Sequence, residues 1–143
     1  MTTAIVSSQN TAICWADVIA YPETGFKSKL LLDDKNCRYT LMSLAAEMQI
    51  AEHGNPRNAT VNVIEGQGLL TLDGKELVLE SGVFIFIPAN IRHAVKATSN
   101  LSFLLTLNAV SSLFSFFRRE EGVIRSQYHA QIKSIKKRDL ILL

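Results

Sequence analysis

Cysteine, proline and histidine are all scarce in this sequence of 143 residues, which has two, three and three of them respectively. The two cysteines, Cys14 and Cys37, have neither a CxxC spacing nor a histidine cluster around them. A disulfide framework and a cysteine zinc site are therefore excluded, and a reducing cytoplasm is the expected location. No internal repeat or low-complexity segment stands out.

An excess of charge of one sign is also missing, because 15 Lys and Arg are nearly balanced by 13 Asp and Glu, for a net charge of +2. This balance gives no reason to expect nucleic-acid binding. No apolar run approaches the roughly 20 residues of a membrane-spanning helix, and residues 1–10 lack the basic and apolar regions of a secretory signal. We therefore expect a cytoplasmic protein with neither nucleic acid nor membrane as a partner.

Several catalytic motifs are absent as well: a glycine-rich phosphate loop, a GxSxG elbow, an HExxH pair and a cysteine–histidine pair at nucleophile spacing. The enzyme classes that depend on these motifs are disfavoured.

The middle of the sequence consists of short β-branched and aliphatic runs, each closed by Gly, Pro, Asn or Asp. Such runs predict strands, and Asp73-Gly74 predicts a two-residue hairpin between two of them. Because no helices alternate with the strands, the fold class is all-β, as a sandwich, barrel or jelly roll. The expected strands are 26–32, 37–44, 48–53, 60–64, 68–72, 75–79, 83–87, 93–97 and 101–108.

Both ends of the chain differ from this β region. Residues 1–25 are expected to pack on the barrel, and Ala16–Ala20 within them fits either a helical turn or a strand. Beyond the strands of residues 26–108, Ser111-Ser112 can cap a helix, and a second segment repeats apolar residues every three or four positions. We therefore expect a helical extension over residues 109–143.

His53 and His93 lie forty residues apart, each at the end of an expected strand. A metal site in a β-barrel needs ligands that converge from different strands, and imidazole is the commonest such ligand. A histidine at a strand end is more often a hydrogen-bonded structural residue. Spacing alone leaves both interpretations open.

The surrounding residues resemble the two motifs of the cupin superfamily. Residues 52–68 read EHGNPRNATVNVIEGQG, and residues 82–95 read GVFIFIPANIRHAV. The order and separation of these segments fit the family, and in particular its small single-domain, RmlC-like members. The resemblance implies a double-stranded β-helix, or jelly-roll, barrel with the C-terminal helices as an extension.

The first cupin motif, G-x5-H-x-H-x3-E-x6-G, fits without gaps when His53 takes its first histidine and Gly66 its closing glycine. In this frame its leading glycine falls on Glu47, its second histidine on Asn55 and its glutamate on Ala59.

The second motif, G-x5-P-x-G-x2-H-x3-N, matches at Gly82, Pro88 and His93, whereas its second glycine falls on Asn90 and its asparagine on Ala97. In the family, three histidines and one glutamate bind a divalent metal. Only His53 and His93 of those four ligands remain, so the resemblance supports the fold more than the usual metal site.

The candidate ligand-binding residues are His53, Asn55, Arg57, Arg92 and His93. The two arginines either hold an anionic ligand such as a carboxylate or are solvated loop residues. The first functional hypothesis is a cupin barrel that encloses a small pocket near His53 and His93 and binds a small organic molecule there, anionic if the arginines hold it, with or without a metal.

The alternative is a metal-dependent cupin enzyme, a dioxygenase or isomerase, with Fe, Mn, Ni or Zn bound by His53 and His93. Its carboxylate ligand would come from Glu47 or Glu52, both of which also fit a surface position. A third hypothesis is a barrel kept for assembly, with the C-terminal helices as the surface of a homodimer.

Overall fold

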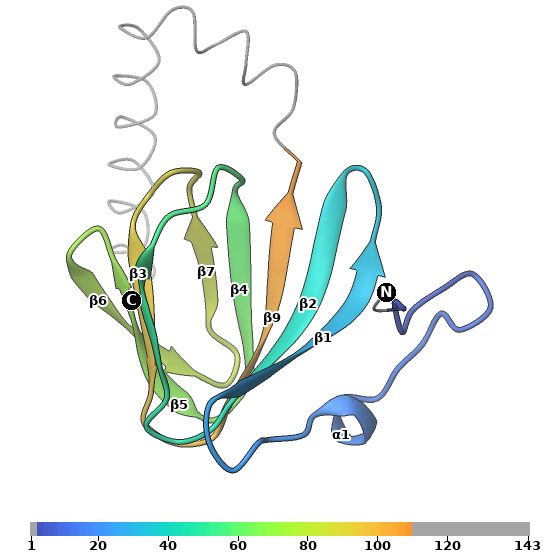
Figure 1. Cartoon of the computed structure of the whole chain (residues 1–143), viewed down its shortest axis with the longest axis horizontal. Coiled ribbons are helices and arrows are strands. Elements are labelled where there is room, and N and C mark those ends of the chain that lie inside the picture. The colour runs from blue at the N-terminus through green and yellow to red at the C-terminus, as the bar shows by residue number, and fades with distance from the viewer. Residues whose placement is uncertain (1–2, 110–143) are drawn as a thin grey trace, which may run out of the picture. The chain divides into compact units, whose positions relative to one another are not determined.

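The computed structural model describes residues 3–109, which form nine strands and one helical turn (Figure 1). The nine strands predicted from the sequence are confirmed, each boundary to within one residue. The ambiguous stretch near Ala16 is a short helix. The elements are α1 (Trp15–Val18), β1 (Phe26–Asp33), β2 (Cys37–Leu44), β3 (Gln49–His53), β4 (Ala59–Glu65), β5 (Gln67–Leu72), β6 (Lys75–Glu80), β7 (Phe84–Ile87), β8 (His93–Ala97) and β9 (Leu101–Asn108).

The strands form two antiparallel sheets that face each other (Figure 1). The five-stranded sheet has the order β1-β2-β9-β4-β7, and the four-stranded sheet has the order β3-β8-β5-β6. Strands distant in sequence are therefore neighbours, as when β9 lies between β2 and β4. This arrangement confirms the expected all-β jelly roll.

The predicted hairpin at Asp73-Gly74 is confirmed. Leu72 on β5 pairs with Lys75 on β6, so the turn contains two residues only. Both have positive φ, 48° at Asp73 and 80° at Gly74. Two positive φ angles are what a type I′ turn requires, and its twist matches that of the strands it joins.

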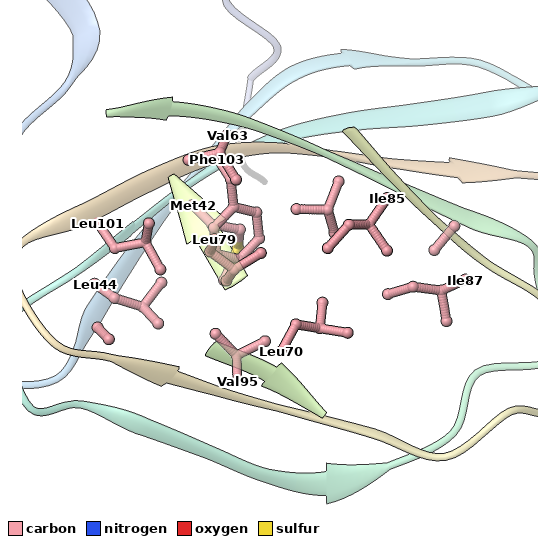
Figure 2. Close-up of a cluster of buried hydrophobic side chains, with 13 residues drawn as sticks. Met42, Leu44, Val63, Leu70, Leu79, Ile85, Ile87, Val95, Leu101 and Phe103 are labelled. Atoms are coloured by element: carbon pink, nitrogen blue, oxygen red, sulfur yellow. The ribbon is translucent and has the colours of Figure 1, made fainter. Parts of the chain in front are cut away.

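The hydrophobic core lies between the two sheets and follows from alternation along the strands. On β4, every second residue from Ala59 to Val63 is buried. On the opposite sheet, Leu70 and Val95 point towards these residues (Figure 2). Burying one such aliphatic side chain contributes about 1.5–3 kcal/mol, so the alternation fixes which face of each strand is inside.

The N-terminal residues form hydrogen bonds with strands of the five-stranded sheet, including its edge strand β1. The N–H groups of Ile5 and Val6 donate to the carbonyls of Leu30 and Leu31, and the Tyr21 hydroxyl donates to Glu65 Oε1 at 2.6 Å. These bonds connect both ends of the segment to strands of the same sheet.

Within residues 3–109, no helix has the length and apolarity needed to cross a membrane. The helices expected after Ser111, and with them the predicted homodimer surface, lie outside the described residues.

Candidate functional site

The glycine positions of the two motifs keep their backbone conformation even where the glycine is missing. Gly66 and Gly82 have φ angles of 91° and 89°. Glu47 and Asn90, which stand where the family has glycine, have φ angles of 68° and 65°. Positive φ is uncommon for residues other than glycine. All four positions at which the motifs have glycine therefore have positive φ, which supports the ungapped alignment of the two cupin motifs with this sequence.

The strand register places both histidines on the inner face of the four-stranded sheet. His93 on β8 is paired with Leu72 on one side and with His53 on the other. It is two residues from Val95, which belongs to the core, so the two side chains share a face. A bulge between Ile50 and His53 gives β3 one extra residue and keeps His53 in register with His93.

The two imidazole rings are neighbours, with ring centroids 4.3 Å apart and ring planes tilted by 57°. Each ring is oriented by the backbone just before it, because Nδ1 lies 2.9 Å from the carbonyl oxygen two residues earlier, that of Ala51 for His53 and that of Ile91 for His93. A carbonyl oxygen only accepts, so each Nδ1 carries the hydrogen. In the neutral ring, Nε2 then has a free lone pair for a ligand or a metal.

The two histidines differ in their exposure. His93 is buried, with 8% of its surface exposed, whereas His53 is exposed. Burial lowers the pKa of His93 below its ordinary value of 6.5, the hydrogen bond to the Ile91 carbonyl opposes this, and the charge of His53 adds to the lowering. The lowered pKa favours the neutral form of His93, in which Nε2 has a free lone pair.

Hydrogen bonds join the two motif loops to each other. The Asn90 N–H donates to the Asn55 carbonyl at 2.7 Å, and the Ala89 N–H donates to Asn58 Oδ1 at 2.9 Å. The side-chain oxygen of Asn55 accepts the N–H of Arg57 at 2.9 Å, so it is used inside its own loop. Sequence reasoning missed Asn58, although an asparagine in a loop commonly bonds nearby backbone.

The structure brings the two histidines together and pairs one of the two arginines, Arg92, with a carboxylate. Arg92 Nε lies 2.6 Å from Glu52 Oε1, and both side chains are mostly exposed. Arg57 contributes to lowering the pKa of Asp33, after the larger effect of the Arg38 hydrogen bond. A role for either arginine in holding an anion stays a prediction.

The donor set does not fit the four-ligand metal site of the cupin family. Ala59, where the family has glutamate, is only 3% exposed and its methyl group lies in the hydrophobic core. Asn55, where the family has its second histidine, uses its side-chain oxygen for the Arg57 N–H. In the part of the chain that the structure describes, no group of three or more His, Cys, Asp or Glu side chains is placed to hold a metal ion.

Known structures resemble this fold over most of its length. A protein of unknown function from Streptococcus pyogenes is 22% identical with a TM-score of 0.68, covering 78% of this chain and 96% of its own. A cupin superfamily protein from Desulfitobacterium hafniense is 16% identical with a TM-score of 0.67, covering 77% and 99%. A cupin 2 conserved barrel domain protein from Leptotrichia buccalis is 36% identical with a TM-score of 0.62, covering 66% of this chain and 46% of its own.

The sequence itself matches a family model for the cupin domain over residues 40–107. No curated protein matches it. The matched range extends from β2 to β9 and contains both histidines and all four motif positions with positive φ. Together with the two-sheet fold and the structural matches, this shows that the chain belongs to the cupin superfamily.

Proposed function

We propose that this cupin barrel binds a small organic molecule at His53 and His93, without a metal ion as its anchor. The observation that carries the proposal is the pair of rings 4.3 Å apart, each with Nδ1 held by a backbone carbonyl. Orientation of both rings by the backbone leaves two Nε2 atoms, from two adjacent strands, for one bound molecule.

The absence of metal from the proposal rests on the chemistry of the donors. Two imidazoles supply no anionic ligand, and the position of the family's glutamate is a buried methyl group at Ala59. Iron and manganese sites of the carboxylate–histidine kind need that negative charge. Glu52, the carboxylate next to His53 in sequence, is paired with Arg92.

Metal analysis of protein purified without an affinity tag tests this proposal against the enzymatic alternative. We expect iron, manganese, nickel and zinc to be far below one equivalent in the wild type and in a His53→Ala variant alike. One equivalent of any of them in the wild type, lost on the His53→Ala substitution, would overturn the proposal and favour a metal-dependent cupin enzyme.

Ligand binding is tested by nuclear magnetic resonance of the histidine rings in the full chain. A screen of small organic molecules should contain hits that shift the His53 and His93 ring signals together, because the two rings are in contact. A matched Arg38→Gln variant, whose side chain pairs with Asp33 elsewhere on the surface, should keep every hit. Hits that move neither ring would refute the proposed site.

A further inference from the structure

The orientation of the two histidines also restricts the chemistry of the molecule that they bind. Both Nδ1 atoms face the backbone carbonyl two residues earlier, in β3 for His53 and in the loop before β8 for His93, at the same distance of 2.9 Å. This repeated arrangement gives both rings the same tautomer, so that both Nε2 atoms are hydrogen-bond acceptors when the rings are neutral. A ligand that engages the pair must therefore supply two donors.

The charge of the ligand is restricted by the neighbouring groups. A carboxylate has no hydrogen to donate to two acceptors, and the guanidinium of Arg92 is already 2.6 Å from Glu52. Because the Glu52 carboxylate is paired with Arg92, it is not available to attract a ligand that carries an ammonium group. His93 is buried beside core residues, and an unpaired charge next to it would lose its hydration.

Two residues beside the pair, Leu72 and Ile50, are apolar. Leu72 is the strand partner of His93, and Ile50 precedes the bulge that ends at His53. Both are partly buried and pack against the core cluster. A ligand body that contacts these side chains gains from being aliphatic or alicyclic.

We infer that the pair binds a neutral molecule with two adjacent hydroxyl groups on an apolar body, a vicinal diol, with each hydroxyl donating to one Nε2. This inference rests on the proposed function, because it assumes that His53 and His93 form the binding site. It adds the class of ligand, in which two hydrogen-bond donors and the absence of charge are the selected features.

The first test concerns the free protein and needs no ligand. At pH 8, long-range proton–nitrogen spectra of the full chain should show Nδ1 protonated and Nε2 unprotonated in both rings. A protonated Nε2 in either ring would overturn the inference, because that nitrogen would then be a donor.

The second test compares four probes that share one ring: cis-1,2-cyclohexanediol, cyclohexanecarboxylate, cyclohexylammonium and cyclohexanone. At pH 8 we expect the diol to shift both histidines at the lowest concentration of the four. Tighter binding of the carboxylate, the ammonium ion or the ketone would refute the diol and leave the site itself intact. If none of the four moves either ring, the diol inference fails, while the broader screen still decides the proposed site.

Variants that keep the ring shape and remove the acceptor complete the test. His53→Phe and His93→Phe should each weaken diol binding about tenfold, the effect of one neutral hydrogen bond. Arg38→Gln, at a surface arginine that pairs with Asp33, should leave diol binding unchanged. Because His53 is exposed, its variant should remain folded even if the His93 variant does not. Unchanged diol affinity in His53→Phe would overturn the inference.

Discussion

Replacing Glu47 by glycine should stabilise this protein. Glu47 has a φ of 68°, at a position where the cupin motif has glycine. For a residue with a Cβ atom, the left-handed conformation costs about 1–2 kcal/mol. The Glu47→Gly substitution removes that cost and adds about 0.5–1 kcal/mol of chain entropy to the unfolded state. The net change in the free energy of unfolding should be a gain of about 0.5–1 kcal/mol.

The matched control is Glu76→Gly, which replaces another exposed glutamate, this one inside β6. Glu76 is not among the residues with positive φ, so its replacement by glycine raises the entropy of the unfolded chain without relieving backbone strain in the folded state. We expect a loss of about 0.5–1 kcal/mol. The two variants have the same chemical change and opposite expected signs, so effects of lost charge do not explain a difference between them.

The assay is urea denaturation of the full chain, followed by tryptophan fluorescence from Trp15 and by circular dichroism. The midpoint should rise for Glu47→Gly and fall for Glu76→Gly at similar m-values. Equal losses in the two variants would refute the reasoning, because Glu47 would then lie on an ordinary extended backbone.

Three further predictions use the same denaturation assay. The Gly66→Ala substitution should lower the free energy of unfolding by at least about 2 kcal/mol, because residue 66 has a φ of 91° and a Cβ atom there would lie 1.9 Å from the Asn100 carbonyl oxygen. An unchanged free energy of unfolding would mean that the backbone of Asn100 is not this close to residue 66. The Ile85→Ala substitution in the core should lower the free energy of unfolding by about 2–5 kcal/mol, whereas Phe84→Ala, at a neighbouring side chain that is 59% exposed, should lower it by less than about 1 kcal/mol. Equal losses would contradict the assignment of Ile85 to the inner face of β7. Burial lowers the pKa of His93 below 6.5 in the folded protein, so the unfolded chain binds more protons and the free energy of unfolding should fall as the pH drops from 6.5 towards the folded pKa. The His93→Gln variant should show a flatter dependence of the free energy of unfolding on pH between pH 5 and 8. An unchanged dependence would mean that other groups cause it.

Most of the fold could be predicted from the sequence, because alternation and turn chemistry act locally. The strand β4 reads as apolar at every second position, and Asp73-Gly74 favours one turn type whatever surrounds it. The pairing of strands was not accessible in this way. That β9 lies between β2 and β4 depends on contacts between distant segments, and only the family resemblance indicated it.

The candidate site was predictable in part. The sequence named His53 and His93, and the structure places their rings in contact. It did not indicate that each Nδ1 bonds a backbone carbonyl, because ring orientation depends on strand geometry. It also did not indicate that Arg92 pairs with Glu52, since two exposed loop and strand charges have many possible partners.

The loss of the family's glutamate can be tested by reversing it. Ala59 faces Ile87 and Leu107 across its two neighbouring strands and is 3% exposed. In Ala59→Glu, a carboxylate would therefore be buried among apolar side chains, and without a counter-charge the expected loss is several kcal/mol.

A divalent metal would offset that loss if the motif frame is right in space. In the double variant Asn55→His and Ala59→Glu, four donors would meet at one site, and a small excess of Zn²⁺ or Mn²⁺ should raise the melting temperature by several degrees. The wild type and the Ala59→Glu single variant serve as controls, since both lack part of the ligand set. If the metal raises the melting temperature of all three proteins equally, residues 55 and 59 do not face the histidines. The correspondence with the cupin ligand positions would then be limited to His53 and His93.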